Sequence, residues 1–508
     1  MTGHFTPLDV AVLIAYLAGT TAFGVRLGRR QKDANDYFVA GRNIPWPAVL
    51  FSVVATETSA LTFISIPGVA YIGNLGFLQV VFGYLLGRIA LAFTLLPRYY
   101  EGEIVTAYAM LEQRFGLATR RFTSVVFMGT RALADSVRIF ATAIPVALIL
   151  SGTGRVPSPW LMPSAILILG ALTVLYTYKG GMRAVVWTEL IQAGIYLFGG
   201  LTAVVLLGRT VPGGWHAILD RAGAAGKLHL FDWSVGFDRP YTMLAGLLGG
   251  GFLSMASHGA DQLIVQRLLS ARSLRDAQKA VIGSGVAIIV QMALFLMIGV
   301  GLWAHFGGRG FATPDDAFPT YIIQAMPPGL LGLVVAAIVA ATMSTHSAAI
   351  NALAASATHD LYLPLTGRSA ADPRTLRVGK AFALFWGVAL TAGALLFRQQ
   401  GTPAVVIALS IASFTYGGLL GGFFLALFVP RAGQRDAIVG MSVGIAAMSV
   451  VVFAKQIATA YPSLAATLGP LAAIAWPWYV LIGTAITLLT GTLSSLAGAS
   501  AGGGARPS

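Results

Sequence analysis

The stretch 51–71, FSVVATETSALTFISIPGVAY, constrains this fold more than any other part of the chain. It lies in an apolar segment that begins near Ile44, and it carries a dense polar cluster: Thr56, Glu57, Thr58, Ser59 and Thr62. In a bilayer every polar group needs a partner inside the protein, so such a cluster is tolerated only where a helix lines a cavity or is locally broken. Small hydroxyl residues also pack helices together, but a buried carboxylate costs about 2.5–3.5 kcal/mol. Glu57 therefore favours a binding site at mid-membrane depth.

The composition of the chain is that of an integral membrane protein. Its 508 residues are 56% hydrophobic and 10% charged, with a mean hydropathy of +0.77, whereas a soluble chain carries about a quarter charged residues. The absence of cysteine excludes disulfides, thiolate metal sites and cysteine nucleophiles. The sequence also lacks a metal-binding His pair at helical spacing and a nucleophile with its base, so we do not expect an enzyme.

Apolar segments of roughly 20 or more residues predict an all-α integral membrane fold with about 13 transmembrane helices. They cover residues 8–28, 45–71, 77–98, 123–152, 158–178, 186–208, 242–268, 277–306, 318–357, 378–397, 402–428, 436–455 and 475–496. An odd number of helices places the two termini on opposite sides of the membrane. The start, MTGHFTPLD, lacks the basic region of a signal peptide, so we interpret the first segment as a retained helix.

Basic charge is distributed unequally between the loops, and this bias sets the orientation. The net charge is +14. Twenty-one Lys and Arg residues fall in one set of loops and eight in the other. We therefore expect the N-terminus outside and the C-terminus in the cytoplasm.

The spacing of the segments suggests an internal duplication. Helices two to six and seven to eleven form two blocks of five, which gives the blocks opposite orientations. Each block opens with an interrupted segment, ATETSALTFISIPG or LLGGGFLSMASHGADQ, and such a pair points to a central transport site. We divide the chain into an extra helix with its loop (1–44), a first repeat (45–208), an outside loop (209–241), a second repeat (242–428), two C-terminal helices (429–496) and a flexible tail (497–508).

The fourth predicted helix carries three charged residues on one face. Arg131, Asp135 and Arg138 are spaced i, i+4 and i+7. Asp135 can satisfy one arginine but not both, so a substrate carboxylate fits as the missing partner, and a guanidinium can bind it in a bidentate manner. A purely structural ion network is the alternative. We assign Arg131 and Asp135 to such a network and Arg138 to the substrate.

The ninth predicted segment, VVAAIVAATMSTHSAAINALAASATHDLY, is rich in Ala, Ser and Thr. Ala341, Ser344, Thr345 and Ser347 lie within two helical turns, so hydroxyls and a carbonyl can converge on one ion. Uncharged oxygen ligands suit a hard monovalent cation such as sodium. Close packing of small residues is again the alternative.

Five motifs together make the chain recognisable. It carries ATETSALTFISIPGVAY, GGMRAVVWTELIQ, ASHGADQLIVQR, VAATMSTHSAAIN and SIASFTYGGLLGG. In order and spacing they resemble the sodium:solute symporter family, over roughly residues 8–430. The resemblance implies a LeuT-like 5+5 inverted repeat, with one extra N-terminal and two extra C-terminal helices. In that fold the first and sixth core helices are unwound around the substrate, and a sodium site lies between the first and eighth core helices.

The resemblance also implies sodium ligands, residue by residue. Ala55, Thr58 and Ala341 match backbone-carbonyl ligands, while Ser344 and Thr345 match a pair of hydroxyls.

A second sodium site is implied in some members of the family. Glu189 occupies the position of their aspartate, with Ser344 and Ser347 as neighbours. The longer glutamate departs from that pattern, and so does Ala348, where such members have serine.

For the substrate, the resemblance points to positions that face the ligand in relatives. Arg138 resembles the arginine with which sialic acid transporters hold a carboxylate. Thr62 and Ser254 replace a glutamine and an asparagine of sugar-transporting relatives. We expect the substrate to bind among Glu57, Ser59, Thr62, Phe77, Arg138, Ser254, His258 and Ser413.

These features predict a sodium-coupled secondary active symporter that imports a small organic solute by alternating access. We expect an organic anion, a carboxylate such as sialic acid or a monocarboxylate. A sodium-coupled sugar or polyol symporter, a proton-coupled transporter that uses Glu57 or Asp135, and a solute sensor are the alternatives. His258, Asp261 and His346 could also carry a proton or bind substrate. We expect a monomer in a bacterial inner membrane, with the solute, Na⁺ and lipid as partners and no nucleic acid.

Overall fold

The computed structural model describes residues 5–27, 33–101, 104–151, 159–397 and 404–502. Within these ranges the chain is helical and forms no strand. A helix satisfies its own backbone groups, which an apolar bilayer requires. The expectation of an all-α fold is confirmed.

Eight helices of the described residues are long and apolar enough to cross a membrane. They are α1 (Pro7–Leu27), α9 (Leu161–Thr210), α13 (Leu274–Phe306), α15 (Leu330–Ser356) with its continuation to Thr366, α17 (Pro373–Leu396), α18 (Ala404–Phe428), α19 (Gln434–Val452) and α22 (Trp478–Gly502). A bent pair, α3 (Trp46–Glu57) and α4 (Ala60–Ile72), passes the same test together. The protein is therefore a multi-pass membrane protein.

Further helices complete the bundle and its two ends. They are α2 (Ala34–Val39), α5 (Phe77–Phe93), α6 (Leu95–Tyr100), α7 (Tyr108–Phe115), α8 (Leu117–Ser151), α10 (Gly214–Ala224), α14 (Ala317–Ala325), α16 (Leu363–Thr366), α20 (Ala454–Ala460) and α21 (Ala465–Ala472).

Four predicted segments have a structure that differs in detail from the hydropathy pattern. Segments 158–178 and 186–208 are the two halves of α9, which is kinked at Gly181, where φ is 56° and glycine is favoured. Segment 318–357 begins as α14 and continues as α15. Segment 242–268 divides into the π-turns η2 (Ala245–Gly250) and η3 (Ala256–Ala260), with α11 (Gly251–Met255) between them and α12 (Gln262–Leu269) after them.

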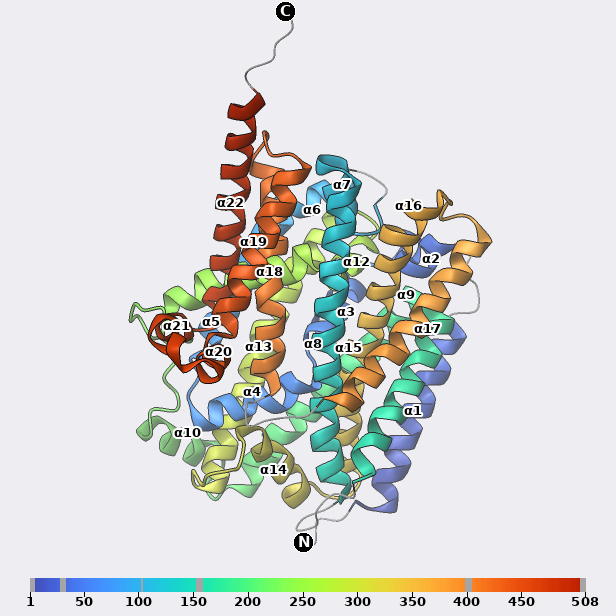
Figure 1. The fold of residues 1–508 in the computed structure, drawn as a ribbon. Helices are drawn as coiled ribbons and strands as arrows, with labels where there is room; N and C mark the ends of the chain where they lie inside the picture. Colours follow the sequence, from blue (N-terminus) through green and yellow to red (C-terminus); the bar gives the residue numbers. More distant parts are fainter. Residues whose placement is uncertain (1–4, 28–32, 102–103, 152–158, 398–403, 503–508) are drawn as a thin grey trace, which may run out of the picture.

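Helix α15 forms the centre of the bundle. Of its most apolar window, 94% is buried inside the protein, compared with 28% for α1 and α17. Its many alanines let α1, α8, α9 and α17 pack closely around it, and Figure 1 shows it between α3, α8 and α9. A central helix with small side chains places its hydroxyl groups inside the protein, away from lipid.

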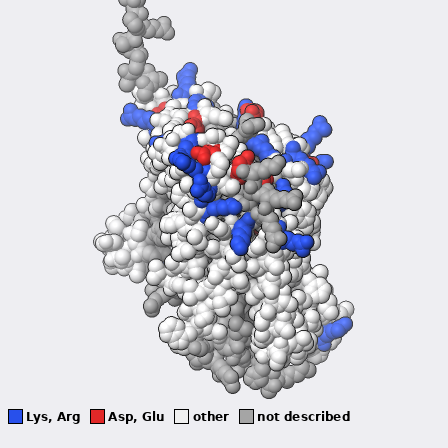
Figure 2. Space-filling model, turned by 90° about the vertical axis from the view of Figure 1, so that its right-hand side faces the viewer, with Lys and Arg blue, Asp and Glu red and all other residues white. Residues whose placement is uncertain are grey.

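The two ends of the bundle differ. In Figure 1, α1 begins at the end that carries α10 and α14, and α22 ends at the opposite end, near α6 and α7. On the face shown in Figure 2, Lys and Arg side chains gather over the end where α22 finishes, and they are sparse toward the other end. Such an asymmetry is typical of a protein with a fixed orientation in the membrane.

Candidate functional site

The first broken helix leaves backbone oxygens without their helical partners. α3 ends at Glu57 and α4 begins at Ala60, and the two are bent by 63°. The Ser59 N–H would bond the Ala55 carbonyl in a continuous helix, but it donates to the Glu57 carbonyl at 3.1 Å. Within the described residues, no backbone N–H donates to the carbonyls of Ala55 or Thr58. Unpaired carbonyls at a helix break are suited to bind a cation.

The position of this break differs from the turn signals in the sequence. Pro67 and Gly68 lie inside α4, eight or more residues beyond the break. The chain opens instead at Thr58, whose φ and ψ are −82° and 90°. The Thr58 hydroxyl accepts a bond from Gln291 Nε2 at 2.5 Å, which ties the break to α13.

The second broken segment runs from η2 to α12. Asp261 separates η3 from α12, and its Oδ1 accepts the Leu263 N–H at 2.8 Å, which caps α12. The two interrupted motifs of the sequence are therefore both interrupted helices in the structure.

A cavity of about 120 Å³ lies between the two broken segments. Six of its lining residues belong to the predicted substrate site: Glu57, Ser59, Thr62, Phe77, Arg138 and Ser254. The others were not predicted: Leu61, Ile66, Tyr84, Leu253, Ser257, Met292, Ala412 and Tyr416. Tyr84 follows Phe77 at i+7 on α5, a spacing that could have revealed it.

Two predicted substrate residues do not line this cavity. His258 is buried behind its wall, with Nε2 3.7 Å from Glu57 Oε2 and Nδ1 3.1 Å from the Ser254 carbonyl. Ser413 is buried and its hydroxyl has no partner among the described residues, while its neighbours Ala412 and Tyr416 reach the cavity.

Glu57 is balanced by an arginine from α5. Its Oε2 accepts a bond from Arg88, a fully buried side chain that also donates to the hydroxyls of Ser284 at 2.7 Å and Ser254 at 3.4 Å. The ion pair explains how a carboxylate is tolerated at this depth.

The charged face of α8 is more nearly neutral than the sequence indicates. Arg131 pairs with Asp261 of the second broken segment and also lies 3.5 Å from Asp135. The hydroxyl of Tyr416 donates to the same Asp261 carboxylate at 2.5 Å. Within α8 the two arginines have only Asp135 to share, but Asp261 of the second broken segment provides a second carboxylate.

Arg138 nevertheless has donors to spare. Its Nη1 lies 3.7 Å from Asp135 Oδ1, too far for a hydrogen bond, and its buried Nε has no partner among the described residues. A guanidinium carries five N–H donors and no acceptor. Arg138 therefore offers unused donors at the wall of the cavity.

One predicted sodium residue of α15, Thr345, lines a small pocket that shares Ser59 and Arg138 with this cavity. A pocket of about 10 Å³, room for roughly one water-sized sphere, is lined by Thr345 and His346 together with Ser59, Arg138 and other residues of α8 and α15. Thr345 Oγ1 donates to the Ala341 carbonyl at 3.1 Å. The buried Ser344 hydroxyl has no partner within the described residues. α15 packs against both α3 and α4, which carry the unpaired carbonyls.

Glu189 is engaged by its surroundings. Both of its oxygens contact the fully buried Arg267 of α12, at 2.7 and 3.4 Å. It also accepts the hydroxyls of Ser52 and Thr56 on α3. Ser347, its predicted neighbour, donates to the Ser344 carbonyl at 3.0 Å. Arg267 lies at the end of the predicted segment 242–268, and the structure makes it a buried partner of Glu189.

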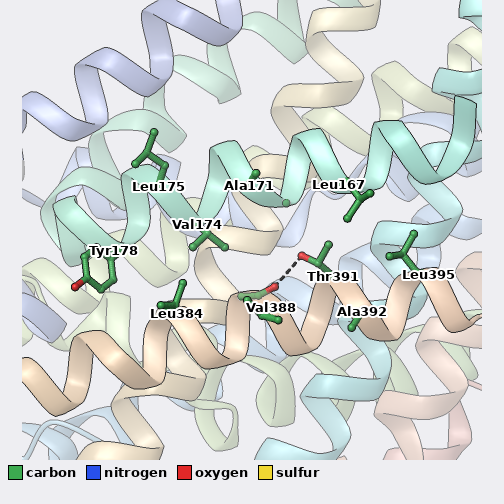
Figure 3. Close-up of a pocket in the computed structure, with 12 residues that line it drawn as sticks. Leu167, Ala171, Val174, Leu175, Tyr178, Leu384, Val388, Thr391, Ala392 and Leu395 are labelled. Carbon is green, nitrogen blue, oxygen red and sulfur yellow. Dashed lines mark hydrogen bonds between the residues drawn. The ribbon is translucent and has the colours of Figure 1, made fainter.

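A larger and apolar groove lies elsewhere in the bundle. A groove of about 520 Å³ lies between α9 and α17, lined by residues such as Leu167, Val174 and Leu384 (Figure 3). Thr391, the one hydroxyl besides Tyr178 in its lining, donates to the Gly387 carbonyl at 2.7 Å. The groove has no charged lining residue, so it lacks the polar chemistry of a transport site.

Known proteins resemble this chain in sequence and in fold. The sequence profile of the sodium:solute symporter family matches residues 37–444. The chain belongs to the sodium:solute symporter family. A sodium/sialic acid symporter of Aliivibrio fischeri is 29% identical to this chain over 451 residues, and the match covers 87% of each chain. The human sodium/iodide cotransporter is 27% identical, over 87% of this chain and 69% of its own length.

A solved structure extends the likeness to the whole symporter fold. The substrate-bound, outward-open structure of a Na⁺-coupled sialic acid symporter matches with a TM-score of 0.81 and 27% identity, over 97% of this chain and 98% of that one. The protein is thus a sodium-coupled solute symporter and not an enzyme, and Na⁺ is its coupling ion.

Proposed function

We propose that this symporter imports an organic anion, a carboxylate, which binds Arg138 in the cavity between the two broken helices. The observation that carries the proposal is that Arg138 lines the cavity with unused N–H donors. A carboxylate can accept two parallel bonds from a guanidinium. Sialic acid and monocarboxylates are the carboxylates that we expect.

Sodium binds, in this proposal, to the carbonyls of Ala55, Thr58 and Ala341 and the hydroxyls of Ser344 and Thr345. Support comes from the carbonyls of the α3–α4 break and the Ser344 hydroxyl, which have no partner among the described residues. Thr345 shares a pocket with Ser59 and Arg138. Ion and solute would therefore bind side by side, so that each favours the closure that traps the other.

The second sodium site at Glu189, Ser344 and Ser347 stays a prediction. The contacts with Arg267 weigh against it, because that cation already neutralises the carboxylate. A tenfold sodium gradient is worth about 1.4 kcal/mol. With one sodium ion, transport of a monoanion is electroneutral, so accumulation is limited to roughly tenfold. A second ion would add the voltage term, about 3.5 kcal/mol at a potential near 150 mV.

For the architecture, we propose thirteen spans arranged as two inverted repeats, residues 45–208 and 242–428. The extra helix 1–44 precedes them, the loop 209–241 joins them, and residues 429–496 and 497–508 follow. The basic end of the bundle would face the cytoplasm of a bacterial cell, with the protein as a monomer in the inner membrane. The gathering of Lys and Arg at one end supports this orientation.

Thermal unfolding of the purified protein in detergent tests the substrate class. Carboxylates, sugars and amino acids are each added with Na⁺ or with K⁺. A ligand at 100 times its Kd stabilises the folded state by about 2.7 kcal/mol, so we expect a rise in Tm with a carboxylate and only in Na⁺.

Arg138→Ala should abolish the rise in Tm that the carboxylate produces and keep the smaller rise in Tm that Na⁺ alone produces. Arg183→Ala, which removes an arginine whose side chain is 49% exposed, is the matched control and should behave as the wild type. Stabilisation of Arg138→Ala by the carboxylate at wild-type concentrations would rule out Arg138 as its partner.

A further inference from the structure

We propose that Glu57 selects a solute that carries a neutral hydrogen-bond donor as well as a carboxylate, so the substrate is a hydroxylated carboxylate and not a plain one. The inference rests on the proposed function, because Arg138 supplies the carboxylate site. It concerns a second recognition point in the same cavity.

The two oxygens of Glu57 have different surroundings. Oε2 accepts the bond from Arg88 and is the oxygen that lies 3.7 Å from His258. Oε1 accepts no bond from the described residues, and it is not among the buried atoms that lack a partner. The Glu57 side chain is 18% exposed, whereas that of Arg88 is fully buried. Oε1 is therefore the oxygen open to the cavity that Glu57 lines.

Among the described residues that line the cavity, only Glu57 and Arg138 have a fixed hydrogen-bonding sense. The hydroxyls of Ser59, Thr62 and Ser257 can rotate to donate or to accept. An ionised carboxylate only accepts, and a guanidinium only donates. Glu57 thus requires a donor from the solute where Arg138 requires an acceptor.

The charge of Glu57 decides which kind of donor fits. Arg88 already balances it with a buried cation. An ammonium group on the solute would place a second cation beside this ion pair. Because Arg88 already balances the charge of Glu57, burying that second cation would cost free energy. A hydroxyl or amide N–H donates without adding charge. Apolar lining residues such as Leu61, Ile66 and Met292 would contact the carbon skeleton of the solute.

The experiment compares carboxylates that share a carbon skeleton and differ in hydroxyls. Gluconate is paired with hexanoate and lactate with propionate, with N-acetylneuraminate as a larger hydroxylated probe and sorbitol as a neutral one. Each is titrated in Na⁺ while the Tm of the full chain is followed. A bond to a charged acceptor is expected to make the hydroxylated member of at least one pair about tenfold tighter or more.

Glu57→Gln should bring the ratio of the Kd values of the two members of a pair close to one. Its amide oxygen turns to Arg88, so its NH₂ faces the cavity and the free acceptor is lost. Sodium-dependent stabilisation by the carboxylates shows that this variant is folded. Glu112→Gln, which removes another carboxylate paired with an arginine, Arg120, but one outside the cavity, should keep the wild-type ratio.

The outcomes separate this inference from the proposed function. Equal binding of both members of each pair by the wild type, or an unchanged ratio in Glu57→Gln, overturns the inference alone. Equal binding by the wild type overturns the inference whether or not the variant folds. If sorbitol stabilises the protein as much as gluconate does, the proposed carboxylate substrate is overturned and the inference with it. The same holds if none of the carboxylates stabilises the protein.

Discussion

Single residues in this symporter are distinguished by which of their polar atoms remain unpaired. The hydroxyl of Ser344 and the Nε of Arg138 are buried without a partner in the described part of the chain. Such groups cost free energy unless something else binds them. Glu189, by contrast, is fully engaged by Arg267 and by the hydroxyls of α3.

Ser344→Ala should weaken sodium binding and leave the fold intact. Loss of one oxygen ligand is expected to raise the sodium concentration for half-maximal uptake by about five- to tenfold. Ser356→Ala is the matched control, because the hydroxyl of Ser356 on α15 is also buried with no partner among the described residues but is not a predicted ligand. An equal sodium dependence of both variants would remove Ser344 from the site.

Glu189→Gln distinguishes a structural ion pair from a sodium ligand. It leaves Arg267 buried and unpaired, so the free energy of unfolding should fall by about 3–5 kcal/mol. If the role is structural, the Tm falls equally in Na⁺ and in K⁺. A loss of stability seen only in Na⁺ would instead favour the second sodium site.

At the scale of elements, close contact between broken and unbroken helices shapes the cavity. A Cβ on Gly87 of α5 would lie 2.1 Å from the Gly251 carbonyl and 3.1 Å from Ser254 Cβ. A Cβ on Gly83 would likewise lie 2.1 Å from the Gly246 carbonyl of η2. These glycines bring Arg88 within reach of Ser254, beside Glu57.

Gly87→Val should push α5 away from α11. Overpacking of this kind typically costs about 1–3 kcal/mol, so we expect a lower Tm and weaker solute binding. Gly129→Ala serves as the control: nothing lies within 4 Å of a Cβ added there, and alanine is favoured over glycine in a helix by about 0.5–1 kcal/mol. An unchanged Tm for Gly87→Val would mean that the two helices are not held in contact.

The whole molecule has a basic end and an opposite end that carries α10. Loop 209–241 is tied to that opposite end by the bond from Lys227 Nζ to the Tyr71 carbonyl at 2.7 Å. The chain contains no cysteine, so single cysteines introduced at either end can report its orientation without a background signal.

Ala225→Cys, just after α10, should react with a membrane-impermeant maleimide on intact cells. Ala371→Cys, just before α17 at the other end, should react only after the cells are permeabilised. Both positions are exposed, and the cysteine-free wild type is the blank. The reverse pattern of labelling would invert the proposed orientation.

The sequence by itself determined the class of protein, the helical segments and the two interrupted motifs. Hydropathy and local polar clusters are properties of neighbouring residues, so they can be read along the chain. The cluster around Glu57 predicted the break that lies at Thr58, and six of the predicted substrate residues line one cavity.

Only the tertiary structure decided which charges meet. Arg131 and Asp261 are 130 positions apart, Glu189 and Arg267 are 78 apart, and Glu57 and Arg88 are 31 apart. Each pair joins different helices, and its contact depends on packing distances such as those at Gly87. Spacing along one helix can place Arg131, Asp135 and Arg138 on a common face, but it cannot supply the partner that another helix contributes. The balance of charge, and with it the free donors of Arg138 and the free oxygen of Glu57, is therefore a property of the folded molecule.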